Sequence, residues 1–212
     1  MTMGTSGSVT TGHEALSHAL VRVVAERGWA QTSPQRVARE AGLPPHEFWD
    51  HYRSLEHCFV KVYDRMLARL MVSATRAVAS RPLTLGRQAW QDQLEAAIGA
   101  VLTFLSVEPM LARACIVEGL AVGPIAREHR DAALGRFVSY VEGLHLSHGE
   151  PMPPLAAEMI ALGTYELIYT RVARGEAEQL PDMLPELRRM WTASVEAHSP
   201  PVPAPSTALA AR

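Results

Sequence analysis

Apolar residues recur along most of this chain at spacings of three and four, which is the period of an amphipathic α-helix. Leu16, Leu20 and Val24 mark a first helix, and Gly28 ends it, because glycine enters the left-handed conformation of a helix stop at little cost. The segment 32–34, "TSP", supplies the hydroxyl cap and the proline that are typical of a new helix start. We find no alternating strand pattern and no hairpin dipeptide between apolar runs. The sequence therefore predicts an all-α fold.

The same period predicts about nine helices. A third short helix is expected to begin at Pro44-Pro45, and Arg53-Ser54 precede a long stripe that runs from residue 55 to about 79. A helix of that length spans about 37 Å at 1.5 Å per residue, enough to join two subdomains. The remaining apolar stripes run through Trp90 to Leu105, Leu111 to Leu120, Leu134 to Leu144, about 153 to 174 and about 182 to 197.

The stretch 41–52, "AGLPPHEFWDHY", predicts a helix-turn-helix. Gly42 permits a tight turn between two short helices, which sets them at a steep angle. In such a motif the first helix crosses the DNA backbone and the second, here called the reading helix, lies in the major groove. We expect Phe48 and Tyr52 to anchor the reading helix on a small core and to leave its other side chains facing outward.

Residues 19–59, "ALVRVVAERGWAQTSPQRVAREAGLPPHEFWDHYRSLEHCF", resemble the DNA-binding domain of the TetR family of bacterial transcriptional regulators. The resemblance rests on "AERGW", Thr32-Ser33, "AGL", Trp49, His51-Tyr52, and Ser54 with Glu56. It implies a three-helix helix-turn-helix domain followed by a helical bundle that binds a ligand and dimerises. The expected divisions are a disordered N-terminus at 1–11, a DNA-binding domain at 12–53, a regulatory and dimerisation domain at 54–198, and a disordered proline-rich tail at 199–212.

The resemblance and the residue chemistry together predict a DNA-contacting set. Arginine side chains bind phosphates well, and hydroxyls and helix N-termini hold them too. The predicted DNA contacts are Thr32, Ser33, Arg36, Pro45, His46, Glu47, Trp49, His51, Arg53 and Ser54.

The reading helix departs from the family pattern. Pro44, His46, Glu47 and Leu55 stand where that pattern has serine, glycine, threonine and lysine. The helix therefore carries two acids, Glu47 and Asp50, and no lysine or arginine. An acid can accept a hydrogen bond from cytosine N4, and His46 can donate to guanine, but acids near phosphates weaken binding. A domain that no longer binds DNA remains an alternative.

A protein that reads two half-sites must be a dimer, and the last two helices have apolar arcs wide enough for two buried faces. The resemblance implies that these helices pair with their copies in a homodimer. Simple core burial is the alternative. The predicted interface residues are Leu155, Met159, Leu162, Leu167, Met183, Leu187, Met190 and Trp191.

The resemblance implies an effector pocket for an unknown small molecule between the fourth and seventh helices, with Tyr165 contributed by the eighth. Glu118 lies in the apolar stretch "CIVEGLAVG", and a buried carboxylate needs a partner, either Arg113 or a cationic ligand. Ordinary core packing is the alternative for the whole set. The predicted lining residues are Phe104, Met110, Arg113, Cys115, Glu118, Tyr140 and Tyr165.

Composition narrows the remaining classes. The net charge of -2 and a small polar N-terminus predict a cytoplasmic protein with neither a strongly basic surface nor a signal peptide, and no run is long enough for a membrane span. Cys58 and Cys115 lie far apart in apolar patterns, as reduced buried thiols do. His145, His148 and Glu150 have metal-ligand spacing at a helix end, but we expect no metal and no cofactor there.

No nucleophile or phosphate-loop motif is present, so we do not expect an enzyme. The sequence predicts a dimeric repressor that reads an inverted-repeat DNA operator through its third helix and is released by a small-molecule effector. A ligand-binding or antirepressor protein without DNA affinity is the alternative. A helical-bundle enzyme that uses Glu118 is a more distant one.

Overall fold

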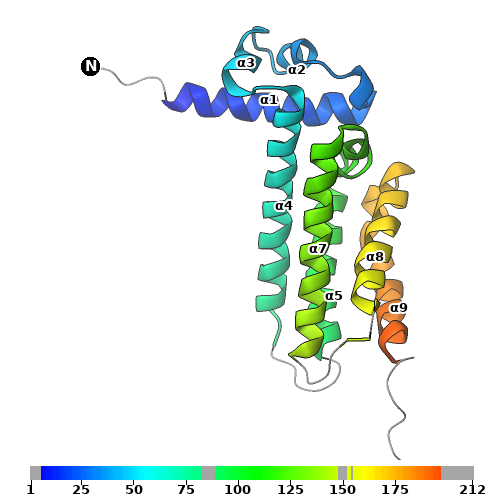
Figure 1. The fold of residues 1–212 in the computed structure, drawn as a ribbon. Coiled ribbons are helices and arrows are strands. Elements are labelled where there is room, and N and C mark those ends of the chain that lie inside the picture. The colour runs from blue at the N-terminus through cyan, green and yellow to red at the C-terminus, as the bar shows by residue number, and fades with distance from the viewer. Residues whose placement is uncertain (1–5, 83–88, 148–151, 154, 197–212) are drawn as a thin grey trace, which may run out of the picture.

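The computed structural model describes residues 6–82, 89–147, 152–153 and 155–196, and these residues form helices and turns without a strand. The all-α prediction is confirmed. In Figure 1 the first three helices form a head, and the remaining helices form a bundle that hangs below it. The predicted tail at 199–212 and the first five residues lie outside the described residues.

The head contains α1 (Ser6–Arg27), the 3-10 turn η1 (Trp29–Gln31), α2 (Pro34–Glu40) and α3 (Glu47–His51). α1 begins at Ser6. Residues 6–11 are therefore helical, whereas disorder was predicted there. α3 begins at Glu47 and not at Pro44-Pro45, because the prolines form a preceding turn in which the Glu47 N–H donates to the Pro44 carbonyl at 3.1 Å.

The bundle contains one long helix from the head and several that return beside it. Its elements are α4 (Leu55–Ala79), α5 (Ala89–Val107), α6 (Pro109–Ala112), the π-helix η2 (Arg113–Val117), the 3-10 turn η3 (Glu118–Ala121), α7 (Pro124–Leu146), α8 (Ala156–Ala173), the 3-10 turn η4 (Ala177–Met183) and α9 (Leu184–Glu196).

The predicted helix boundaries were wrong where one apolar stripe contains turns of more than one helix type. The sixth predicted helix is a single α-turn followed by π and 3-10 turns, and the 3-10 turn η4, which contains Pro181, precedes α9, which begins at Leu184. Apolar spacing does not distinguish such short pieces, because the 3-10 and π-helix each differ from the α-helix by less than one residue per turn.

One continuous apolar core runs from the head into the bundle. α4 packs along both α5 and α7, and α7 packs against α8. The largest fully buried side chains belong to both halves of the molecule: Leu16, Leu20, Phe48, Tyr52, Phe59, Leu94, Leu102, Leu105, Leu180 and Leu187. This shared core joins the head to the bundle (Figure 1).

Candidate functional site

The turn between α2 and α3 ends α2 and sets the direction of α3. Gly42 has φ +71°, its N–H donates to the Arg39 carbonyl at 3.1 Å, and the Leu43 N–H donates to the Ala38 carbonyl at 2.9 Å. These are the two hydrogen bonds of a Schellman motif, which requires a left-handed residue after the helix. The predicted tight turn at Gly42 is therefore confirmed.

α3 is anchored as predicted. The Phe48 side chain is fully buried, and the Tyr52 hydroxyl lies 3.0 Å from the Ser17 hydroxyl of α1 in a buried hydrogen bond. With these two rings inward, Trp49 and Asp50 project from the other side of the helix, and 52% of the Trp49 side chain is exposed. Pro45 and His46 extend this exposed surface, whereas Glu47 is half-buried.

His51 turns toward α1 rather than away from it. Its Nε2 lies 2.8 Å from where a Cβ at position 12 would stand, so Gly12 makes room for the ring. The His51 and His13 rings meet edge to face with centroids 6.2 Å apart. Burial, with the neighbouring Arg65 guanidinium, lowers the pKa of His13. His51 thus packs the head together, and its predicted contact with DNA stays a prediction.

The hydroxyls predicted to hold phosphates cap two helices. The Ser33 Oγ accepts from the Arg36 N–H at 3.2 Å at the start of α2, and the Ser54 Oγ accepts from the His57 N–H at 3.1 Å at the start of α4. The Thr32 hydroxyl donates to the Gly28 carbonyl at 2.9 Å. Each hydroxyl has a structural role that requires no DNA.

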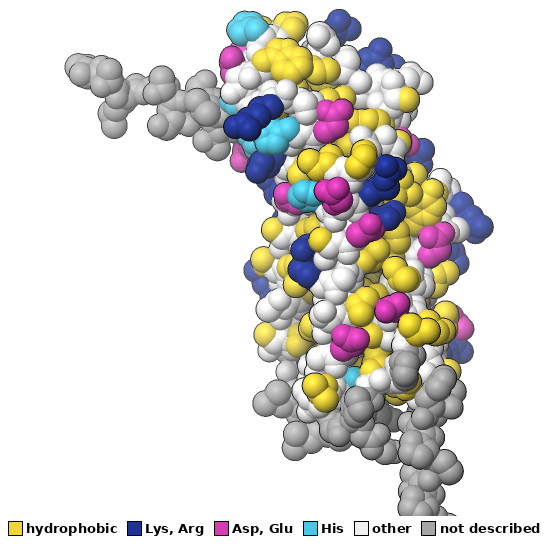
Figure 2. Space-filling model, viewed as in Figure 1, with side chains coloured by type: hydrophobic (Ala, Val, Ile, Leu, Met, Phe, Trp, Pro, Cys, Tyr) yellow, Lys and Arg dark blue, Asp and Glu magenta, His cyan; other side chains and the backbone are white. Residues whose placement is uncertain are grey.

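Arginine side chains flank the exposed face of α3. Arg39 and Arg53 are exposed, and Arg36 is half-buried. On the face shown in Figure 2, charges of both signs are interspersed, so the surface does not present a single broad basic patch. Phosphate binding at this head would therefore depend on a few individual guanidinium groups.

Two predicted ligand contacts instead join the head to the bundle. The Glu118 carboxylate accepts from the Trp29 N–H at 2.9 Å, and the Arg113 Nε donates to the Ala25 carbonyl at 3.1 Å. Glu118 does not pair with Arg113 as expected, because each side chain pairs with backbone near the end of α1, and the pairing of Glu118 with a cationic ligand stays a prediction. We call these two hydrogen bonds the head–bundle joint.

Gly28 completes the head–bundle joint. It has φ +81°, and a Cβ there would lie 3.3 Å from Glu118 Oε2. A side chain would therefore be strained by its backbone and would also press on the carboxylate. The Trp29 ring then meets the Phe59 ring of α4 edge to face at 5.6 Å, so the same corner also touches the long helix.

The other predicted pocket residues mostly fill space. Cys115 and Tyr165 line a void of only about 10 Å³, roughly the room for one water molecule. Burial raises the pKa of the Cys115 thiol to about 12. The Phe104 ring lies under the Arg69 guanidinium at 4.7 Å, and Met110 is 39% exposed on α6. The described cavities do not include Phe104, Met110, Arg113 or Glu118 in their linings.

A larger cavity of about 400 Å³ lies between α4, α5 and α7. Tyr140 is the one predicted pocket residue that lines it. Small side chains at facing positions of three helices, among them Ala74, Ala97 and Ala133, leave this space open. The other lining residues are Leu67, Leu70, Met71, Thr75, Val78, Ala79, Ile98, Val101, Arg136 and Phe137.

The predicted dimer residues divide into two groups. Met183, Leu187 and Trp191 are buried in the chain's own core, and the Trp191 Nε1 donates to the Thr164 Oγ1 at 3.3 Å. Their prediction as interface residues is wrong, because their side chains face inward. The exposed members, here called the α8/α9 face, are Leu155, Met159, Leu162, Leu167 and Met190.

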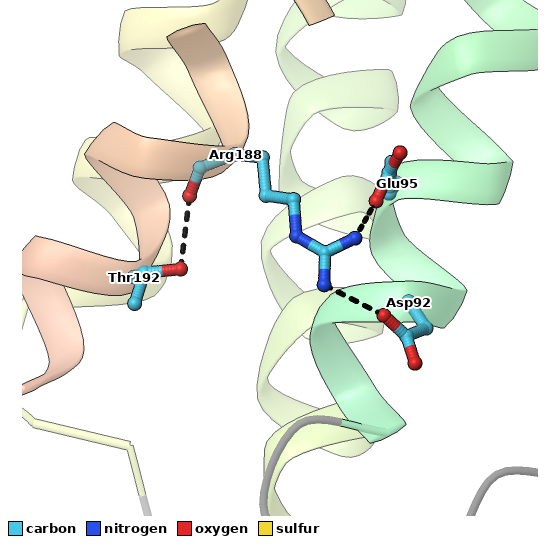
Figure 3. A network of polar contacts seen from close by, with 4 residues as sticks. All are labelled: Asp92, Glu95, Arg188 and Thr192. Carbon is cyan, nitrogen blue, oxygen red and sulfur yellow. Dashed lines mark hydrogen bonds and ion pairs between the residues drawn. The ribbon is translucent and has the colours of Figure 1, made fainter. Parts of the chain in front are cut away.

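α9 is also tied to the bundle by charge. Figure 3 shows the Arg188 guanidinium forked between Asp92, at 2.7 Å, and Glu95 on α5. This forked contact and the buried Leu187 and Trp191 hold one side of α9 against its own chain. The orientation leaves Met190 exposed, at 48%, on the other side.

The same described residues offer neither a metal-binding cluster nor a single membrane-spanning helix. They contain no group of three or more His, Cys, Asp or Glu side chains able to hold a metal ion, and His148 and Glu150 lie outside them. No single described helix is long and apolar enough to cross a membrane. The pair Ala89–Val107 and Pro109–Ala121 satisfies that test only together and is bent by 103°.

Comparison with known proteins identifies the fold. No known family profile matches the sequence, and no curated protein matches it. The chain is similar to the fatty acid degradation regulator FadR from Bacillus halodurans, with a TM-score of 0.71 and 15% identity over 90% of this chain and 96% of that chain.

Two further solved structures agree. The transcriptional regulator FadR from Bacillus subtilis, in complex with stearoyl-CoA, has a TM-score of 0.71 and 16% identity over 86% of this chain and 98% of that chain. A TetR family transcription regulator from Marinobacter aquaeolei VT8 has a TM-score of 0.66 and 18% identity over 89% and 97%. The chain therefore has the fold of TetR family transcription regulators, which confirms the fold expected from the resemblance.

The head–bundle joint yields a first prediction. In a Glu118→Ala variant the Trp29 N–H loses its acceptor, so its hydrogen exchange should accelerate at least about tenfold, and unfolding stability should fall by about 1 kcal/mol. Amide exchange followed by NMR and urea unfolding measure the two effects. Glu166→Ala, on the exposed side of α8, is the matched control. Unchanged protection of the Trp29 amide would show that the carboxylate does not hold the head.

Proposed function

We propose that this chain is a dimeric DNA-binding transcription regulator that represses by reading an inverted-repeat operator through α3. The observation that carries the proposal is the outward projection of His46, Trp49 and Asp50 above the buried Phe48 and Tyr52, on a chain with the fold of TetR family regulators. That arrangement presents a short helix edge-on, as entry into a major groove requires.

The exposed chemistry fits a base-reading surface flanked by phosphate contacts. His46 can donate to guanine acceptors, and the Asp50 and Glu47 carboxylates can accept from cytosine N4. The Trp49 indole N–H can donate to the backbone or to a base. Arg39 and Arg53 supply exposed guanidinium groups for the phosphates on either side of the groove. A single α3 is expected to bind DNA weakly, so high affinity requires two copies joined in a dimer.

The α8/α9 face supports the homodimer. Met159 and Leu155 are 63% and 66% exposed, and Leu162 and Met190 are each about half exposed, so this face is apolar and uncovered in the single chain. An apolar face of this kind is typical of a protein–protein interface. Pairing it with its copy would place two heads at the same end of a joined bundle, as two half-sites one helical turn apart require.

The effector would occupy the cavity between α4, α5 and α7. α4 connects this cavity to the head directly, since it begins beside α3 at Leu55 and lines the cavity from Leu67 to Ala79. A ligand that fits the cavity best at one tilt of α4 would shift the population toward that tilt. The two reading helices would then no longer match consecutive major grooves, and the operator would be released.

One observation favours a second candidate, a ligand-binding protein that has lost DNA affinity. α3 carries Glu47 and Asp50 and no basic side chain other than histidine, so its field repels phosphates. The enzyme alternative has no comparable support. Its candidate base, Glu118, already accepts a backbone hydrogen bond in the head–bundle joint.

Selection of bound duplexes from a random DNA pool, at low and near-physiological salt, tests DNA reading. We expect an enriched inverted repeat. Replacing His46 by Ala should change the preferred bases at one position of each half-site, with about 1–3 kcal/mol of lost discrimination. Arg39→Ala and Arg36→Ala should instead weaken all sites alike and reduce the salt dependence by about one ion per subunit. A folded dimer that enriches no sequence at either salt supports the second candidate.

The α8/α9 face gives a separate prediction. Met159→Glu introduces a charge at the centre of the proposed interface, so the chain should sediment as a monomer and lose operator affinity by at least about a hundredfold. Val107→Glu, at an exposed apolar position on α5, is the matched control and should remain dimeric. Analytical ultracentrifugation distinguishes the outcomes, and a Met159→Glu protein that stays dimeric rules this face out.

A further inference from the structure

The cavity between α4, α5 and α7 is suited to an apolar ligand body. Eleven of its fourteen lining residues have hydrocarbon or thioether side chains, and its volume of about 400 Å³ is within the usual range for small-molecule sites. The polar exceptions are Thr75, Arg136 and Tyr140. A strongly hydrated ligand would lose its water there without replacement hydrogen bonds along most of its length.

Arg136 is the one charged group among the described lining residues. It lies on α7 on the same face as Ala133, Phe137 and Tyr140, and it is exposed, which places it where the cavity meets solvent. It has no hydrogen bond or ion pair with any described residue, in contrast to Arg130, which pairs with Asp131 at 2.7 Å on the same helix. An uncompensated guanidinium beside an apolar space favours an anionic group.

Tyr140 adds a neutral hydrogen-bond donor beside this cation. It lines the same cavity one turn after Arg136, and its side chain is a little over one-third exposed. Burial raises the pKa of Tyr140, so its hydroxyl stays protonated at neutral pH and able to donate. A guanidinium and a phenol one helical turn apart can both donate hydrogen bonds to the oxygens of a single carboxylate or phosphate.

We propose that the cavity takes an amphipathic organic anion, with a hydrocarbon chain between the three helices and a single carboxylate or phosphate head at Arg136 and Tyr140. The assignment of this ligand as an effector rests on the function proposed above. Its binding does not, because the cavity and its cation belong to one chain and lie away from the exposed face of α3.

The same observations favour a free amphiphile over a coenzyme A thioester. Coenzyme A carries several phosphate charges, and its recognition would need several cations near the mouth, whereas the described lining supplies Arg136 alone. The inferred ligand therefore differs from the stearoyl-CoA bound to FadR from Bacillus subtilis, despite the shared fold.

Calorimetric titration of the purified full-length chain without DNA tests the ligand class. The probes share a twelve-carbon chain and differ in head group: dodecanoate, dodecyl phosphate, dodecanol, dodecylammonium and dodecanoyl-CoA, all below their micelle-forming concentrations. We expect one of the two simple anions to bind at least about tenfold more tightly than dodecanol, the ammonium and the CoA ester. The tighter of the two identifies the head as a carboxylate or a phosphate.

Variants assign the binding to this cavity. Arg136→Gln should remove the tenfold preference for the anion and leave dodecanol affinity unchanged, whereas Arg127→Gln, an exposed arginine of α7 outside the cavity, should change neither. Ala74→Phe should fill the space and abolish binding of every probe. Thermal unfolding of each variant checks that it is folded, and Ala97→Leu serves as a second filling variant should Ala74→Phe not fold.

Several outcomes would overturn the inference: equal affinity for dodecanoate, dodecyl phosphate and dodecanol, an Arg136→Gln protein with full anion preference, tightest binding of the CoA ester, or no binding of any probe. Adding the preferred anion to an operator complex then tests the regulatory role separately. Anion binding that depends on Arg136 but leaves DNA affinity unchanged keeps the ligand class and contradicts the proposed release. Binding to the operator, with no difference in affinity among the head groups, keeps the proposed DNA reading and contradicts the ligand class.

Discussion

The arrangement of this molecule depends on a directional contact between a side-chain carboxylate and one backbone amide. Apolar packing alone would hold α1 against the bundle, but it sets no angle, since hydrophobic contact is non-directional. The Glu118 carboxylate on the Trp29 N–H, with Arg113 on the Ala25 carbonyl, adds that direction. A charge-assisted hydrogen bond at a partly buried site is worth more than a neutral one, so two such bonds fix the head where α1 ends.

The head–bundle joint matters because it lies between the exposed face of α3, the proposed base-reading surface, and the cavity. α4 leaves the head at the Ser54 cap and reaches the cavity at Leu67, about three and a half turns later, while the joint holds the head from the other side. The two side chains of the joint lie in η2 and η3, where the chain changes from α to π to 3-10 turns. π-turns of this kind are often found at functional positions. A change in α4 tilt would therefore turn the head about a held point.

At the opposite end, the Arg188 fork and the buried Leu187 and Trp191 keep α9 fixed on α5 (Figure 3). In the proposed dimer this would make α5, α8 and α9 a stable base, since both contacts lie within one chain. Along its cavity-lining half, α4 is joined to the end of α5 by the ion pair of Arg69 with Glu108 at 2.7 Å, whose side chains are 50% and 38% exposed and which therefore holds α4 only weakly. The account thus assigns movement to α4 and the head, and stability to the helices that bear the apolar face.

The sequence predicted what depends on local spacing. The helices followed from the 3.6-residue period, the turn from Gly42, and the shared inward direction of Phe48 and Tyr52 from their four-residue separation. The partner of Glu118 could not be predicted, because it lies 89 residues away in the chain. The place of the cavity could not be predicted for a related reason. It exists where Ala74, Ala97 and Ala133 of three helices face one another, and no pattern along the sequence records which alanines of different helices meet.

The most direct test measures the distance between the two heads. A spin label at Gln35→Cys, an exposed position of α2, can be introduced selectively, because burial raises the pKa of both native thiols, Cys58 and Cys115, to about 12 and leaves them unreactive. Pulsed electron paramagnetic resonance then compares the otherwise native chain, in the proposed dimer, with Glu118→Ala. The account predicts one narrow inter-label distance in the native protein and a broad distribution in the variant. Equally narrow distributions in both would contradict the claim that the joint sets the position of the head.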